Sequence, residues 1–301
     1  MAGFETTIIA VLVMIFLGYF LKRIELLKTA DVETLNKIVI NIAMPCLIFS
    51  SLYLADLSII ADLAILPLIG IIVGFSCGLI AYIILTLKKY PKKKKWSILL
   101  PIILGNTAFL GFPLILGVFG SEGLIRAIFY DMASLITFLS LSIILIFNFD
   151  GKFKDAIKRV LSFPILWAVI LGLILNFLSI PIGDLAITII DYLAAAAIPL
   201  IMISLGLSLH FEGFKYHLKI ATIATIIKLM IGPIIAMSIA ILFGLTGMEF
   251  TIAIVEAGMP SGMLTLVLAI DHDLDFRLTA DCALITTVFS LITLPIIMAL
   301  L

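Results

Sequence analysis

Two short stretches decide how this chain folds: Gly105-Asn106-Thr107-Ala108-Phe109-Leu110-Gly111-Phe112-Pro113 and Glu256-Ala257-Gly258-Met259-Pro260-Ser261-Gly262. Each places proline and glycine inside an otherwise apolar segment. Proline lacks a backbone N–H and clashes with the carbonyl four residues earlier, and glycine lowers the cost of unwinding. We therefore expect an interrupted helix at each stretch, with the carbonyls of Phe109 and Glu256 released. The alternative is that the prolines only kink two packed helices.

The composition around these stretches is that of a membrane protein. Of the 301 residues, 63% are hydrophobic and 13% are charged, and the mean hydropathy is +1.33. A soluble domain has about 45–50% apolar and about 25% charged residues. The composition therefore excludes a soluble enzyme or nucleic-acid binder, and the zero net charge removes any case from overall basicity.

Ten segments are long and apolar enough to cross a bilayer, which takes about 20 residues. They span residues 3–21, 35–54, 63–87, 97–119, 124–148, 163–180, 186–208, 218–244, 249–270 and 277–300. The sequence thus predicts an all-α, multi-pass protein of the cell membrane.

The basic residues fix its orientation, because Lys and Arg accumulate in cytoplasmic loops. With both termini outside, every one of the 19 Lys and Arg residues lies at a cytoplasmic loop except Arg126 and Lys228. The basic run Lys88–Lys95 is interpreted as a topological anchor in preference to a site for nucleic acid or anionic lipid.

The two halves of the chain, 1–151 and 152–301, resemble each other. Matched positions are Ala43–Ile48 with Ala197–Met202, Asp131–Thr137 with Asp281–Thr286, and Pro113 with Pro260. Five spans per half make the second copy inverted relative to the first. Inverted repeats with interrupted helices are typical of secondary transporters, whose sites lie near the midplane. If the fourth and ninth spans cross there, their helix N-termini suit an anion and their free carbonyls suit a cation.

Glu256 is the most informative single residue. A carboxylate inside a span is costly and marks a functional site by default. Its side chain and released carbonyl together suit Na⁺ or a proton, although a neutral, hydrogen-bonded structural acid is the alternative.

Other polar residues of the spans complete the candidate site. Asn106, Thr107, Asp131 and Ser134 add oxygen atoms of the kind that hard cations prefer. We expect Lys228 to pair with a core acid, the alternative being that it extends toward the cytoplasmic side. Asn41 joins the candidates because Pro45 releases its carbonyl.

Two further acidic features are less informative. Asp281 is interpreted as interfacial or structural, because it lies near the inner end of the tenth span. The loop Asp271–Asp275 resembles a metal cluster, but a solvated acidic loop is favoured. No cofactor is expected beyond Na⁺ or H⁺ as a coupling ion, and no metal beyond Na⁺ at Glu256, Asn106 and Asp131.

The residues 105–113, together with Asn41–Phe49, resemble the auxin efflux carrier family, and the similarity runs along the whole chain. Glu256–Met259 is also similar to a motif of the bile-acid/sodium symporters, but Pro260 and Ser261 replace the two amides that follow there. The central loop, 149–163, is short, as in prokaryotic members. Auxin itself is therefore not expected as the substrate.

The resemblance implies a crossed-helix fold like that of the sodium/proton antiporters. It implies a homodimer with a scaffold of spans 1, 2, 6 and 7 and a transport core of spans 3–5 and 8–10. It also implies transport of organic anions, such as auxin-like or dicarboxylic acids.

We accordingly expect a secondary transporter, an efflux carrier of a small organic anion that works by alternating access. The substrate would lie at Asn106, Thr107, Pro113, Pro260, Ser261, Lys228 and Asn41. Ion coupling would use Glu256, Asp131, Ser134 and Asn106. The alternatives are a sodium-coupled uptake symporter and, in another class, a passive anion channel. An enzyme is not expected, because no catalytic motif such as HExxH occurs.

Overall fold

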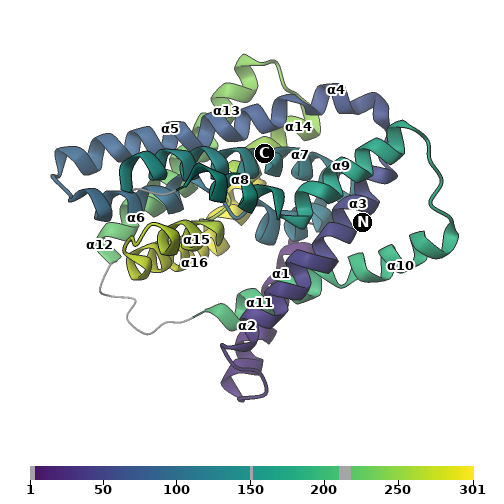
Figure 1. Ribbon diagram of the computed structural model, residues 1–301, viewed down its shortest axis with the longest axis horizontal. Coiled ribbons are helices and arrows are strands. Elements are labelled where there is room, and N and C mark those ends of the chain that lie inside the picture. The colour runs from purple at the N-terminus through teal and green to yellow at the C-terminus, as the bar shows by residue number, and fades with distance from the viewer. Residues whose placement is uncertain (1–3, 150–151, 210–217) are drawn as a thin grey trace. The chain divides into compact units, whose positions relative to one another are not determined.

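The computed structural model describes residues 4–149, 152–209 and 218–301, and within these ranges it is helical apart from one isolated β-bridge (Figure 1). The α-helices are α1 (Phe4–Arg23), α2 (Asp31–Ile38), α3 (Met44–Tyr53), α4 (Ile60–Leu63), α5 (Ile65–Leu87), α6 (Lys92–Ile103), α7 (Phe112–Phe149), α8 (Phe153–Leu161), α9 (Pro164–Phe177), α10 (Asp184–Ala195), α11 (Ala197–Ser208), α12 (Leu218–Ile226), α13 (Gly232–Leu242), α14 (Gly247–Ala257), α15 (Leu264–Asp271) and α16 (Phe276–Leu300). A 3₁₀ turn, η2, covers Leu57–Ile59.

Among the described residues, seven helical segments are long and apolar enough to cross a membrane, or eight if the bent pair α8–α9 forms one span. The prediction of ten spans is not confirmed by this measure. The predicted spans 97–119 and 124–148 are counted as a single candidate, Thr107–Phe149, although the non-helical backbone at Gly120 (φ 70°, ψ −163°) separates two helices within it. The predicted span 249–270 contributes none, because α14 and α15 are each too short to cross alone.

Three π-helical turns, each ending two residues before a proline, interrupt the α-helical pattern. They are η1 (Val39–Ala43) before Pro45, η3 (Thr107–Gly111) before Pro113, and η4 (Ile227–Ile231) before Pro233. In such a turn a backbone N–H bonds the carbonyl five residues earlier, as Gly111 does to Asn106 at 3.3 Å. Local π turns let a membrane helix contain proline while its backbone groups stay paired.

The chain forms two compact units. Unit 1 comprises 1–62, 112–128 and 158–209, and unit 2 comprises 63–111, 129–157 and 210–301, each over its described residues. In unit 1, α1 packs along α11 at Gly18 and Gly206, where a Cβ on Gly206 would lie 1.9 Å from the Ile15 carbonyl oxygen. Small residues at such positions let two membrane helices approach closely.

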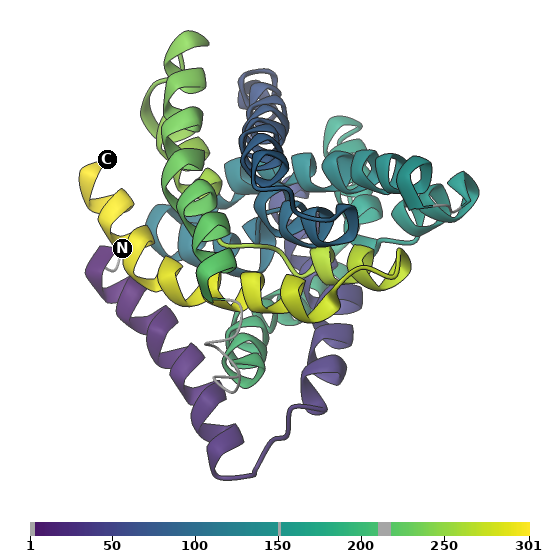
Figure 2. The same ribbon diagram turned by 90° about the vertical axis from the view of Figure 1, so that its left-hand side faces the viewer.

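Unit 2 is built around α6, which contacts α5, α12, α15 and α16. Its seven buried residues, Ser97–Ile103, make α6 a central helix whose neighbours come from distant parts of the sequence. Figure 2 shows the non-helical stretch between α14 and α15, in yellow-green, within this unit. The candidate site lies in unit 2.

Candidate functional site

The two interrupted segments of unit 2 meet in a short antiparallel bridge between Gly105 and Ser261. The backbone N–H of Asn106 donates to the Pro260 carbonyl at 2.7 Å, and the N–H of Gly262 donates to the Leu104 carbonyl at 3.0 Å. Irregular backbone at membrane depth is tolerated only where its polar groups are satisfied or line a cavity. Here the polar backbone groups at the two breaks are satisfied by hydrogen bonds to each other.

Glycine is required at this crossing by the close approach of the two backbones. A Cβ on Gly262 would lie 2.4 Å from the carbonyl oxygen of Gly105. No side chain fits at that separation, so any other residue at 262 would push the interrupted segments apart.

The hydrogen bonding of the carbonyl groups at the breaks differs from what the sequence predicts. The Glu256 carbonyl, expected to be free, accepts the N–H of Met259 at 3.1 Å. At the other break the π turn η3 precedes Pro113 and pairs the Asn106 carbonyl. The expectation that the Glu256 carbonyl is free is therefore wrong, because the helix end tightens locally around it, whereas the cation site at the Glu256 side chain stays a prediction.

The Glu256 side chain, near the end of α14, is fully buried and lacks a partner. Within the described part of the chain, neither carboxylate oxygen has a hydrogen-bond donor. Both oxygens lie against Gly111, where a Cβ would come within 2.5 Å of each. The absence of a side chain at 111 therefore provides the space that the carboxyl group occupies.

Asp131, on α7, is buried but satisfied. The Thr107 hydroxyl donates a short hydrogen bond to one Asp131 carboxylate oxygen, and the Thr107 and Ser134 hydroxyl oxygens lie 3.1 Å apart. The structure thus joins two of the predicted ion-coupling residues, Asp131 and Ser134, to Thr107, which was predicted for the substrate, in one hydrogen-bonded cluster. The cluster links the break after α6 to α7.

Lys228, in the π turn η4, is only 4% exposed. Among the described residues, the ion pairs within 4.0 Å are Glu33–Lys37 and Lys93–Asp273, so Lys228 forms no direct ion pair there with Glu256 or Asp131. Its pairing with a core acid stays a prediction, since Lys228 and Glu256 line the same cavity without direct contact. The Lys228 ammonium instead lies beside Gly105 at the break, 3.2 Å from where a Cβ would stand.

A small cavity connects these groups. Its volume is about 20 Å³, and its polar lining comprises Thr107, Tyr130, Ser134, Thr137, Lys228 and Glu256. A space of this size holds one water molecule or a bare cation. It is too small for an organic anion, so the structure describes a closed arrangement of this core.

The remaining residues that the sequence predicts for the substrate site do not line the cavity. The Ser261 hydroxyl donates to the Pro101 carbonyl at 2.6 Å and accepts from Thr286, so it holds the crossing together. Asn106 is buried at the bridge. Asn41 and Pro113 belong to unit 1, where the Asn41 amide donates to the Lys37 carbonyl.

Several residues at the cavity were missed by sequence reasoning. Tyr130 and Thr137 flank the Asp131–Ser134 turn of α7, and Gly111 makes room for Glu256. The helical spacing of Thr137 from Ser134 was a usable signal, whereas the role of Gly111 required the structure.

The loop 271–275 holds no metal cluster: the described residues contain no group of three or more His, Cys, Asp or Glu that could bind a metal ion. Asp275 caps α16 by accepting the Leu278 N–H at 3.0 Å, and Asp273 pairs with Lys93. Asp281 is half-buried on α16 and does not line the cavity.

Comparison of the sequence with family models assigns the chain to a family. A family model described as "Membrane transport protein" matches residues 4–158 and 152–298. The chain therefore belongs to the membrane transport protein family, that of the auxin efflux carriers, and is a multi-pass membrane protein of the prokaryotic type.

Curated relatives carry transporter names. The chain is 43% identical over 294 residues to an uncharacterized transporter of Methanothermobacter thermautotrophicus, covering 98% of this chain and 97% of that one. It is 36% identical to the uncharacterized transporter MJ1031 of Methanocaldococcus jannaschii, covering 96% of each, and 23% identical to the uncharacterized transporter YfdV of Escherichia coli, covering 87% and 86%. The function of this chain is thus that of a transporter.

Proposed function

We propose that this transporter is a secondary active carrier of a small organic anion, an efflux carrier whose cycle is coupled to H⁺ or Na⁺ at Glu256. The observation that carries the proposal is the fully buried Glu256 carboxyl group, with both oxygens unpartnered, in a cavity that also holds the Lys228 ammonium. An unpaired buried carboxylate costs several kcal/mol, on the order of the desolvation penalty of an ion. Binding of one cation removes that cost.

The sign of the charges explains how the ion and the substrate are coupled. When Glu256 carries its negative charge, it opposes the positive potential that Lys228 contributes to the same cavity. A proton or Na⁺ on Glu256 leaves the Lys228 charge uncompensated beside the crossing at Gly105. That positive charge then attracts a carboxylate, so cation and anion favour each other's binding.

The number and arrangement of the membrane spans belong to the same proposal. We propose ten spans in two inverted repeats, 1–151 and 152–301, with crossed fourth and ninth spans. The mutual hydrogen bonds of the two interrupted segments support the crossing. The compact units support a division into a scaffold and a transport core, because unit 1 holds α1, α3, α9, α10 and α11 while unit 2 holds α5, α6 and α12–α16. The first part of α7, 112–128, groups with unit 1, so the units match this division except in the fourth span. A homodimer remains an expectation from the family resemblance.

The test begins by finding the substrate. Purified protein is screened by thermal shift against organic acids, including dicarboxylates and an indole acid, with and without Na⁺ at two pH values. A ligand that binds only the folded protein raises the unfolding temperature, so a hit reports the substrate and the coupling ion together.

The hit is then used in proteoliposomes with wild type and Glu256→Gln. The wild type should move the anion in response to a proton or sodium gradient. The variant should bind the anion equally well with or without the ion and should lose the gradient dependence. An unchanged dependence on both gradients in the variant removes Glu256 from the coupling role. The direction of the driven flux separates efflux from the sodium-coupled uptake alternative.

A further inference from the structure

A second hollow in unit 2 is separated from the Glu256 cavity by Ile103, which lines both, and extends toward the basic run 88–95. It is a cleft of about 560 Å³ between α5, α6 and the last turns of α7. Small-molecule sites typically measure about 300–1,000 Å³. The transport proposal makes no use of this cleft.

The walls and the mouth of the cleft differ in chemistry. The walls are apolar and come from Phe75, Leu79, Leu99, Leu141 and Ile144. The mouth carries Lys92, Lys95, Trp96 and Tyr82. Tryptophan and tyrosine beside lysine are the residues that membrane proteins place at the level of the lipid headgroups.

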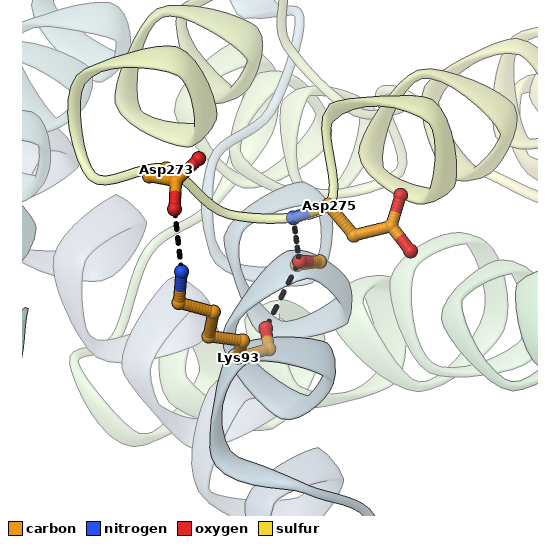
Figure 3. Close-up of polar contacts among 4 residues, drawn as sticks. Lys93, Asp273 and Asp275 are labelled. Atoms are coloured by element: carbon orange, nitrogen blue, oxygen red, sulfur yellow. Dashed lines mark hydrogen bonds and ion pairs between the residues drawn. The ribbon is translucent and has the colours of Figure 1, made fainter.

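Neither of the two lysines at the mouth forms an ion pair with a residue that the structure describes. Lys92 donates to the Asn148 carbonyl at 2.7 Å and lies over the Phe149 ring, and Lys95 contacts the Thr86 hydroxyl and lies over the Tyr82 ring. These partners are neutral. The neighbouring Lys93, in contrast, is paired with the Asp273 carboxylate, as Figure 3 shows.

The start of α6 adds a third attraction for an anion at the same place. The helix begins at Lys92 after Pro91, and no side chain caps its first turn. The N–H groups of a helix N-terminus and its positive dipole end favour a phosphate group. Lys92 and Lys95, one turn apart, lie on the same face of this first turn.

The length and accessibility of the cleft fit a lipid chain. Helix α5 is one of the candidate membrane spans, and the lining residue Phe75 lies 12 residues before its end at Leu87. At 1.5 Å per residue that is about 18 Å along the helix. Leu79 is 60% exposed, so the wall is open at the side where a membrane would contact α5.

From this combination we propose that the cleft binds one anionic phospholipid, with its headgroup phosphate at Lys92, Lys95 and the start of α6 and an acyl chain along α5 and α7. Basic pockets between membrane helices on the cytoplasmic side are suited to anionic headgroups. The charge of the mouth and the apolar walls select a molecule that carries both a phosphate and a hydrocarbon chain.

The test measures lipid retention and is independent of transport. Protein purified from vesicles of equal phosphatidylglycerol and phosphatidylcholine is analysed by native mass spectrometry for bound lipid. Wild type should retain phosphatidylglycerol selectively. The Lys92→Gln/Lys95→Gln variant should lose this selectivity by roughly thirtyfold, because each of the two surface lysines contributes about 1 kcal/mol to anionic lipid binding.

The matched control is Lys88→Gln/Lys89→Gln, which removes two charges from the same basic run but does not line the cleft. It should retain the lipid, and Lys92→Arg/Lys95→Arg should retain it as well, which also guards against a folding defect. Equal loss in both glutamine variants means diffuse attraction and overturns the site. Equal retention of the two lipids by wild type overturns it too.

A last experiment distinguishes binding of the whole lipid from binding of its headgroup alone. Glycerol 1-phosphate, which lacks acyl chains, is added to the lipid-depleted protein in place of phosphatidylglycerol, and thermal unfolding is recorded. The lipid should stabilise the wild type and the headgroup alone should not. Equal stabilisation by both would make this a site for a free phosphate and would overturn the acyl-chain part of the proposal.

Discussion

Asp131 and Glu256 are both buried acids of unit 2, but they differ in their hydrogen bonding. Asp131 is held by the Thr107 hydroxyl, with Ser134 beside it, whereas Glu256 has no hydrogen-bond donor among the described residues. A buried polar group that is fully paired contributes to structure, and one left unpaired costs free energy unless a ligand or proton compensates it. The comparison teaches that burial alone does not identify the coupling group. The absence of a hydrogen-bond donor to the buried carboxyl group is what singles out Glu256.

The largest expected effect comes from exchanging the two acids for their amides. Glu256→Gln should abolish gradient-driven transport in proteoliposomes while leaving the unfolding temperature unchanged or higher, because no hydrogen bond is lost. Asp131→Asn should instead lower stability by about 1–3 kcal/mol, because one acceptor oxygen becomes a donor N–H₂ group and the hydroxyls of Thr107 and Ser134 must reorient to accept from it. Loss of stability in the Glu256 variant with retained coupling would reverse the comparison.

A methyl group at Gly111 tests whether the space around Glu256 matters. In Gly111→Ala the new Cβ would come within 2.5 Å of both carboxylate oxygens, so the carboxyl group must move. Overpacking of this kind costs about 1–3 kcal/mol. Transport should fall sharply and ion dependence should shift, as measured in proteoliposomes. Gly172→Ala, which would instead crowd the Phe49 carbonyl oxygen at 3.1 Å in unit 1, is the packing control and should destabilise without a shift in ion dependence.

Removing one hydroxyl from the Asp131 cluster should have a moderate effect. Thr107→Val keeps the shape of the side chain but leaves Asp131 without its Thr107 donor. We expect a loss of about 1–3 kcal/mol in the free energy of unfolding, the typical cost of an unsatisfied buried partner. Thermal unfolding in detergent measures it, with Thr222→Val, an exposed helix position, as the control. No difference between the two variants would show that the cluster does not need this bond.

The smallest effect concerns the exposed acid Asp273. The hydrogen bond and positive charge of Lys93 hold the pKa of this carboxyl group below its usual value. A lowered folded-state pKa gives stability that is present above the unfolded-state pKa and is lost as the pH falls through the folded-state pKa. Asp273→Asn should therefore differ from wild type only marginally near neutral pH and not at all in strong acid, and high salt should erase the difference.

Much of the membrane character was readable from the chain. Hydropathy identified the apolar segments, and the paired proline–glycine stretches identified both interruptions before any coordinate was known. Proline and glycine act locally on the backbone, so their effect follows from sequence alone. The number of spans was less readable, because a window of hydropathy does not register a kink such as the one at Gly120, which separates two helices within Thr107–Phe149.

The sequence by itself thus determined which residues are apolar, where helices break and which acid lies inside a span, since all three depend on residue type and near neighbours. Only the tertiary structure decided what those groups meet. The Glu256 carboxyl group rests on Gly111, and the Lys228 ammonium lies beside Gly105 at the crossing. Such contacts join residues more than a hundred positions apart, and distances of that kind are set by packing and not by local preference.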